Sequence, residues 1–88
     1  MAGLRLCKDG KTVYTTVFGD FDAAFDSIVE DMEVQKNNDG TLRIEIYGNV
    51  LFENYKPDFD VEKYSDPISL NANLLDELIR KGLVELRE

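Results

Sequence analysis

Apolar and polar residues alternate along residues 4–18, and a polar turn at residues 8–11 interrupts the alternation. The turn contains Asp9-Gly10, a pair favoured in type I′ turns because both central residues take a positive φ. Period-two alternation on both sides of such a pair is typical of a β-hairpin. We therefore predict two antiparallel strands within residues 4–18.

The next segment, residues 20–34, changes to a helical period. Gly19-Asp20 interrupts the strand pattern, and aspartate is one of the residue types that cap helix N-termini. Apolar residues then recur at intervals of three and four, which places them on one helical face: Phe21, Phe25, Ile28, Val29 and Met32. We predict an amphipathic helix over residues 20–34 that buries these side chains against a sheet. The polar run at residues 37–40 ends the segment as a turn.

Residues 41–55 return to strand patterns. Leu42, Ile44 and Ile46 alternate with polar residues, as in a half-buried antiparallel strand. The pair Gly48-Asn49 predicts a tight turn into another strand over residues 50–55.

The last third of the chain predicts a loop, a helix and a short strand. Residues 56–67 contain both prolines and no regular period, so we predict a loop there. Residues 69–81 have an apolar helical stripe: Leu70, Leu74, Leu75, Leu78 and Ile79. Gly82 suits the left-handed position that closes a helix, and residues 83–87 predict the final strand.

These elements follow one another in the order ββαββαβ. Two helices on one face of a mostly antiparallel sheet form a two-layer sandwich of the α+β class. A chain of 88 residues is long enough for one small hydrophobic core. We therefore expect residues 1–88 to form a single domain.

The formal net charge is −8, and the negative charge lies in the middle of the chain. Between Asp20 and Asp66 there are thirteen acidic and four basic side chains, whereas the two ends are close to neutral. Such a field repels phosphate and attracts basic surfaces. We expect a basic protein surface as the partner, with a nucleic-acid-binding protein as the candidate, and no direct binding to nucleic acid or membrane.

The composition removes several kinds of catalytic site. The chain has no histidine, which is the commonest general base and the activating partner of serine and cysteine nucleophiles. The single cysteine, Cys7, lies in a predicted strand, where we expect a small buried hydrophobic side chain. The chain also lacks the glycine-rich loops that bind phosphate. We expect no enzymatic activity and no cofactor, and an enzyme that uses carboxylates with a metal ion is the remaining catalytic alternative.

The N-terminus lacks the apolar stretch of a secretory signal. No apolar run approaches the roughly 18 residues that a membrane span needs. These features predict a cytoplasmic protein.

Four acidic residues of the predicted first helix share one stripe. They are separated by four, four and three residues: Asp22, Asp26, Glu30 and Glu33. Like charges at these spacings repel each other by a few tenths of a kcal/mol per pair. One interpretation is a docking face for a basic partner. The alternative is a solvated face that only keeps a small protein soluble.

The loop at residues 56–67 is a second candidate surface. It contains three alternating acids: Asp58, Asp60 and Glu62. If the chain is extended, alternation directs them to the same side. A mimic of DNA needs such a second row, because carboxylates about 6 Å apart along one helix are sparser than phosphates at roughly 3.4 Å. Three alternating acids are too unspecific to predict a metal site.

Aromatic residues interleave with acids over residues 52–66. Tyr55 and Phe59 are candidate anchors against an Arg-rich surface, through cation–π contacts. The alternative is that both rings face inward and cover the core.

The sequence therefore predicts a small acidic interaction module that inhibits its partner by occluding or neutralising a basic, nucleic-acid-binding surface. Acidic inhibitors from phages and mobile elements, including DNA mimics, act in this way, and the analogy rests on size and charge alone. The alternative is a structural or adaptor protein whose acidic surface only confers solubility.

Overall fold

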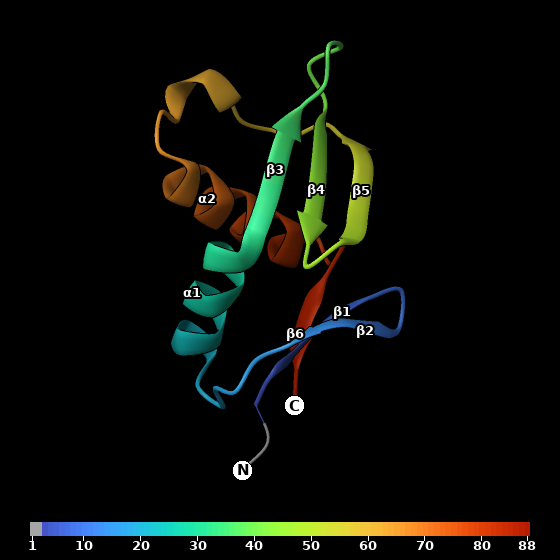
Figure 1. Ribbon diagram of the computed structural model, residues 1–88, viewed down its shortest axis with the longest axis vertical. Helices are drawn as coiled ribbons and strands as arrows, with labels where there is room; N and C mark the ends of the chain where they lie inside the picture. The colour runs from blue at the N-terminus through green and yellow to red at the C-terminus, as the bar shows by residue number, and fades with distance from the viewer. Residues whose placement is uncertain (1–2) are drawn as a thin grey trace.

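The protein has an α+β fold with two helices and two three-stranded antiparallel sheets, and the computed structural model describes residues 3–88 (Figure 1). The first sheet has the order β2-β1-β6 and contains β1 (Arg5–Lys8), β2 (Lys11–Thr15) and β6 (Glu85–Arg87). The second has the order β3-β4-β5 and contains β3 (Met32–Lys36), β4 (Leu42–Ile46) and β5 (Asn49–Tyr55). The helices are α1 (Phe21–Asp31) and α2 (Pro67–Arg80).

The α+β class, the two helices and the antiparallel pairing confirm the prediction from the sequence. The element order differs, because the chain has ββαβββαβ instead of ββαββαβ. The additional strand is β3. The six strands also form two sheets and not the single sheet that we predicted.

The predicted hairpin is present in the first sheet. Asp9 and Gly10 have φ values of 54° and 78°, the positive values that a type I′ turn requires. The C-terminal strand β6 pairs with β1 in antiparallel fashion, Leu6 opposite Leu86. The first and last strands of the chain are therefore neighbours in this sheet.

Helix α1 begins as predicted and ends earlier. The Asp20 side chain accepts a hydrogen bond from the N–H of Ala23 at 3.1 Å and caps the helix. The helix ends at Asp31, and Met32 is already extended, with ψ of 143°. Strand β3 follows with no connecting loop, so the predicted helix over residues 20–34 is wrong in its last three residues. Pairing with β4 over five consecutive positions accounts for the change.

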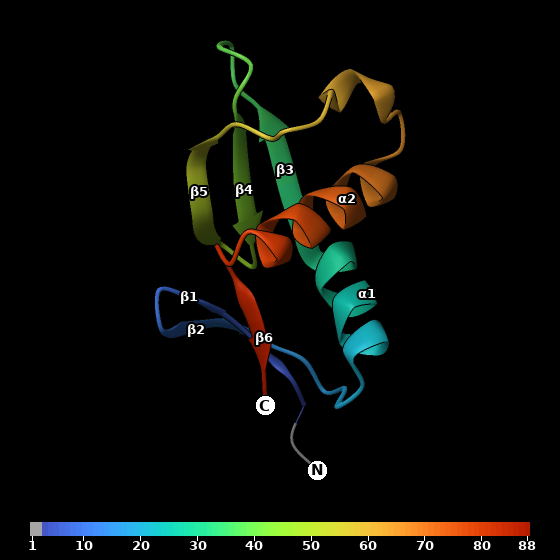
Figure 2. The ribbon, with the colours of Figure 1, turned by 180° about the vertical axis from the view of Figure 1, so that it is seen from behind.

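The predicted apolar face of α1 is buried only in part. Ile28, Val29 and Met32 are buried, whereas Phe25 is half-buried and Phe21 is 49% exposed. The N-terminal turn of α1 lies farthest from α2 (Figure 2). Because α2 does not reach this turn, the burial predicted for Phe21 is wrong.

The hairpin of β4 and β5 turns one residue earlier than predicted. Tyr47 and Gly48 take the positive φ values, 46° and 76°, instead of Gly48 and Asn49. Both register irregularities of this pair place an extra residue on β5. Strand β5 is consequently bulged twice.

The segment at residues 56–67 is mostly irregular and includes one short 3₁₀ helix, Val61–Lys63. Asp66 then caps α2, and its side chain accepts a hydrogen bond from the N–H of Ser69. Pro67 occupies the first helical position, where its missing N–H costs nothing. Gly82 has φ of 71° after the helix, as predicted.

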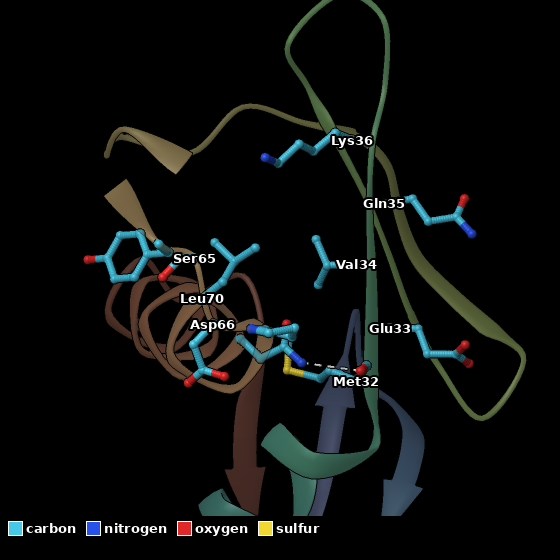
Figure 3. A pocket seen from close by; sticks show the side chains of 11 residues that line it. Met32, Glu33, Val34, Gln35, Lys36, Ser65, Asp66 and Leu70 are labelled. Atoms are coloured by element: carbon cyan, nitrogen blue, oxygen red, sulfur yellow. Dashed lines mark hydrogen bonds between the residues drawn. The ribbon is translucent and has the colours of Figure 1, made fainter. Parts of the chain in front are cut away.

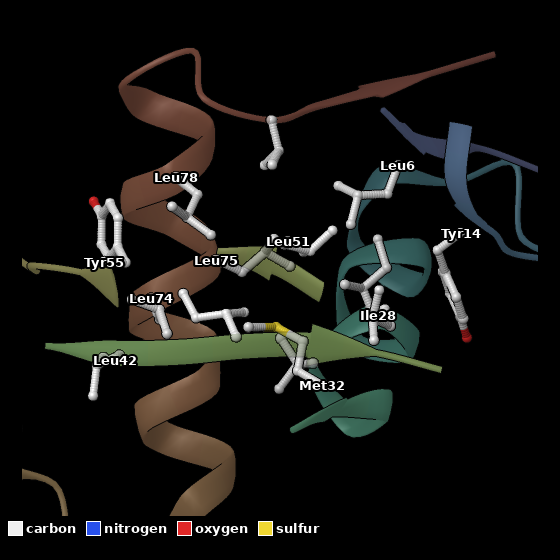
Figure 4. Close-up of a cluster of buried hydrophobic side chains, with 14 residues drawn as sticks. Leu6, Tyr14, Ile28, Met32, Leu42, Leu51, Tyr55, Leu74, Leu75 and Leu78 are labelled. Carbon is white, nitrogen blue, oxygen red and sulfur yellow. The ribbon is translucent and has the colours of Figure 1, made fainter. Parts of the chain in front are cut away.

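The core lies where α1 and α2 pack on the second sheet, and α2 crosses one face of that sheet (Figures 2 and 4). It also includes side chains of the first sheet and its connections, namely Leu6, Tyr14 and Val84. Most of the predicted stripe of α2 is buried here, with Ile79 half-buried. Both sheets thus share one hydrophobic cluster.

Candidate functional site

Three of the four predicted stripe acids lie along α1. Asp22, Asp26 and Glu30 are exposed and four residues apart, so they share one helical face. Within residues 3–88, their carboxylates make no salt bridge and no hydrogen bond. Glu30 also lies in the last turn, where α1 has no basic residue and where the helix dipole disfavours negative charge. No basic side chain of the described residues pairs with the acids of this face.

Glu33 is not part of this stripe. It lies on β3, opposite Glu45 of β4, and its side chain is exposed. Our prediction that it extends the helical stripe is wrong, because α1 ends two residues before it. The stripe is therefore three acids long.

Exposed apolar side chains lie at the start of α1 and in the segment that leads into it, and the sequence analysis missed them. Phe21 is 49% exposed and stacks on Phe25 with ring centroids 6.0 Å apart. Val17 and Phe18, in the segment that leads into α1, are 84% and 43% exposed. The helical period alone assigned Phe21 to the core. Its position at the first residue of the helix was the available signal that it protrudes.

The three acids of the 56–67 segment do not form a row. Asp58 pairs with Lys81 at 2.6 Å, and Glu62 pairs with Lys36 at 2.8 Å. Asp60 accepts a hydrogen bond from the N–H of Glu62 and caps the 3₁₀ helix. The prediction that they point to one side is wrong, because the segment is not extended and each carboxylate is bound to a different element.

The position of this segment also separates it from α1. It runs from the far end of β5 to the start of α2, whereas α1 lies toward the opposite end of the long axis (Figures 1 and 2). The two sets of acids do not form the adjacent rows that a DNA mimic needs. The α1 face is the continuous acidic surface that remains.

Tyr55, at the end of β5, and Phe59 face inward. Tyr55 is buried and donates a hydrogen bond from its hydroxyl to the carboxylate of Glu77. Phe59 is half-buried and packs edge-on against Tyr64, with ring centroids 5.4 Å apart. Tyr55 is therefore not the exposed anchor that we predicted. The alternative, in which these rings cover the core, describes them better.

Two tyrosines have strongly shifted ionisation. Burial, followed by the hydrogen bond to Glu77, raises the pKa of Tyr55 to about 12. Burial, followed by the hydrogen bond to Asp31, raises the pKa of Tyr14 to about 12. Both phenols stay protonated at neutral pH. They act as hydrogen-bond donors that hold carboxylates in place, and neither has the lowered pKa of a catalytic nucleophile.

The described residues contain no cluster of three or more acidic or cysteine side chains that is arranged to hold a metal ion. Cys7 is buried, as expected for a hydrophobic strand residue. None of the helices described in residues 3–88 is long and apolar enough to cross a membrane.

Comparisons with protein families, with curated proteins and with solved structures find no match to this chain.

Proposed function

We propose that this protein is an interaction module that binds a basic surface of a partner protein through α1 and thereby occludes that surface. The observation that carries the proposal is the combination on α1 of three uncompensated carboxylates with an exposed aromatic side chain. Asp22, Asp26 and Glu30 supply the charge, and Phe21 supplies the apolar area.

The pairing of acids with an exposed ring distinguishes docking from solubility. A solvated face needs charge but no exposed phenylalanine, whose transfer out of water stabilises a complex. Aromatic residues are frequent among the few side chains that dominate binding energy, and acids around them steer a basic partner into contact. The combination therefore favours a docking face.

A partner that binds nucleic acid fits this face, because its basic site is built to meet negative charge. Covering such a site would inhibit the partner without any catalysis by this chain. The second candidate function is an adaptor whose acidic surface only confers solubility. One observation favours the adaptor. Asp58 and Glu62 already form salt bridges within the chain, so these two acids are not free to bind a partner.

The test compares two double charge reversals with the same change in net charge. Asp22→Lys/Glu30→Lys alters α1, and Glu53→Lys/Glu88→Lys alters exposed acids elsewhere. Partners captured from lysate by the wild type are identified, and association rates are measured at low and moderate salt. We expect the α1 variant to associate about tenfold more slowly and the control to change by less, because local charges steer encounter.

Exchange of Phe21 tests the apolar side chain at the start of α1. Phe21→Ser should speed dissociation, whereas Ile68→Ser, an exposed apolar residue on α2, should leave it unchanged. A partner that binds the α1 charge variant and its control equally fast would favour the adaptor. An inhibitor further requires that added wild-type protein lowers nucleic-acid binding by the partner.

We also propose that the protein has no enzymatic activity of its own. Metal-dependent hydrolysis of a nucleotide or phosphodiester by the pure protein, lost in Asp58→Asn, would overturn this statement.

A further inference from the structure

Strand β3 is an open edge of its sheet. Its residues pair one to one with residues 42–46 of β4, without a bulge. The other three edges carry features that obstruct pairing with a further strand. Strand β2 has an extra residue in its pairing with β1, β5 has two such irregularities, and β6 is only three residues long. Of these edges, β3 is the one whose regular geometry suits another strand.

Two residues of β3 direct their backbone groups outward. The N–H of Asn37 donates a hydrogen bond to the carbonyl of Thr41 at 2.9 Å. Because hydrogen-bonded positions alternate along an antiparallel strand, Gln35 and Glu33 direct their N–H and C=O groups toward β4. The residues between them, Val34 and Lys36, direct their N–H and C=O away from β4. Among residues 3–88 these four groups have no hydrogen-bond partner. They form the hydrogen-bonding edge that an added strand uses.

The outward carbonyl of Met32 marks the end of this free edge. It accepts a hydrogen bond from the side-chain amide of Asn71 at 3.2 Å (Figure 3). That bond is independent evidence that the backbone carbonyl of Met32, two residues before Val34, points away from β4.

A groove of about 470 Å³ runs along the same edge. Strand β3 lines one side, and residues 64–67 with the first turn of α2 line the other. Figure 3 shows Val34 and Lys36 directed into the groove and Gln35 directed away from it. Val34 and Leu70 give the groove an apolar floor. The groove therefore lies beside the open edge, on the side of the sheet where the inward-facing side chains of an added strand would point.

The charges at the groove favour a basic occupant. Lys36 lines it, but Glu62 neutralises this side chain at 2.8 Å. The carboxylate of Asp66 also lies at the groove, where it accepts hydrogen bonds from the N–H and hydroxyl of Ser69 and makes no salt bridge within the described chain. Glu33 points to the outer face of the sheet (Figure 3), where alternate side chains of an added strand also point.

We propose that β3 accepts an extended segment of a partner protein as a fourth strand of its sheet. Apolar side chains of the segment face Val34 and Leu70, and the alternate basic side chains lie beside Glu33. In such strand addition, main-chain hydrogen bonds give affinity and alternate side chains give specificity. The inference is independent of the proposed function, because it uses β3 and not the acidic face of α1.

The first experiment titrates an end-blocked octapeptide of alternating valine and lysine into ¹⁵N-labelled protein. We expect saturable shifts that are largest at the amides of Val34 and Lys36. A matched peptide of alternating valine and glutamate should bind about tenfold more weakly, because its carboxylates would lie beside Glu33 and repel it. Equal binding of the two peptides, or shifts confined to other strands, would overturn the proposal.

The second experiment removes one outward donor. Val34→Pro deletes an N–H that β4 does not use, at a strand edge where proline is tolerated. We expect peptide binding to fall about tenfold or more, whereas Val34→Thr, which keeps the N–H and the side-chain shape, should bind within about threefold. Unchanged binding by Val34→Pro would exclude strand addition at this edge.

A peptide methylated on alternate backbone nitrogens covers the case in which Val34→Pro fails to fold. On the wild-type protein, loss of binding by this peptide supports pairing through the main chain, and retained binding overturns it. Sedimentation of the protein alone tests a second copy as the occupant. A dimer that Val34→Pro converts to a monomer would assign the edge to self-association and overturn the proposed partner segment.

Discussion

Glu77 is an acidic side chain that α2 buries almost completely, with 2% of its surface exposed. Its carboxylate accepts hydrogen bonds from the Tyr55 hydroxyl and from the N–H of Asp58 at 3.2 Å. The ammonium of Lys81 lies 3.8 Å away. These donors replace the water that a buried carboxylate loses. They also hold the start of the 56–67 segment against α2.

Tyr55→Phe should lower the free energy of unfolding by about 1–3 kcal/mol, because it removes a donor from a buried carboxylate. Tyr14→Phe is the matched control, since the Tyr14 hydroxyl donates to Asp31, which is only half-buried. Water can replace the donor there, so the loss should be smaller. Urea denaturation of both variants measures the difference, and equal losses would contradict the role assigned to Glu77.

Stability should fall as the pH rises from about 10 to about 12. The pKa of Tyr14 and of Tyr55 is about 12 in the folded protein, against about 10 in an unfolded chain. Between these values the unfolded state releases phenolic protons that the folded state keeps, so unfolding becomes more favourable.

The double variant Tyr14→Phe/Tyr55→Phe separates this effect from lysine titration in the same pH range. Its unfolding free energy, measured by urea denaturation at several pH values, should fall less steeply than that of the wild type. Identical slopes would show that the two phenols do not contribute.

At this scale the sequence identified the acids of α1 but not the role of Glu77. Glu77 stands next to Asp76, which is exposed and pairs with Arg80 at 2.9 Å. The pattern does not distinguish the two acids. Only the arrival of Tyr55 and Asp58 from another element makes one of them a buried acceptor.

Among the elements, the connection from α1 to β3 has a dedicated support on α2. Asn71 is buried, and its side-chain amide donates to the carbonyls of Val29 at 3.1 Å and Met32 at 3.2 Å. These carbonyls lie on either side of the point where the helix ends. The amide satisfies backbone acceptors that the change of structure leaves unpaired.

Asn71→Ala should lower the free energy of unfolding by about 1–3 kcal/mol, because it leaves buried carbonyls without a donor. Asn73→Ala, two residues along the same helix, removes a half-buried amide with no hydrogen bond in the described chain. It should change stability by less than about 0.5 kcal/mol. Denaturant titration of both variants checks the contrast, and similar losses would mean that Asn71 does not support the junction.

The same junction shows why β3 was not predicted. Met32 fits the helical spacing of Phe25, Ile28 and Val29, and it also begins the alternation that continues at Val34. No glycine or proline stands between the helical pattern and the strand pattern to mark where the helix ends. Pairing with β4 decides between them, and this long-range contact is not encoded in the local period. The hairpin at Asp9-Gly10 was predicted because its turn signal is local.

On the scale of the whole molecule, a net charge of −8 is confined to a small volume. The principal extents are 42 × 24 × 23 Å. At 0.01 M salt the screening length is about 30 Å, so most acids of the chain repel one another, whereas at 0.15 M it is about 8 Å. Among the described residues, no ion pair compensates Asp22, Asp26 or Glu30. Self-repulsion of this kind destabilises the compact state.

The melting temperature should therefore rise when NaCl is raised from about 0.01 M to about 0.15 M. The rise should be smaller for Asp22→Lys/Glu30→Lys, which removes like-charge repulsion along α1. Calorimetry at the two salt concentrations measures both. A wild-type melting temperature that is constant or falls with salt would contradict a net repulsive field.

The overall charge was readable from composition, but the placement of the two acidic sets was not. Their separation depends on how α2 and β3 lie between them (Figure 1). Residues 56–67 carry alternating acids in sequence, and salt bridges to Lys36 and Lys81 direct them to different elements. Such pairing arises only in the folded chain.

The direct passage from α1 into β3 has a consequence for the natural variation of chain length. One residue inserted at residues 31–32 would turn the helix by about 100° relative to the strand. Alternatively, it would move the side chains of β3 to the opposite face of the sheet. The exposed turn at residues 38–40 can absorb an insertion without either change. Homologous chains should therefore differ in length at that turn and keep the spacing between Ile28 and Val34 constant.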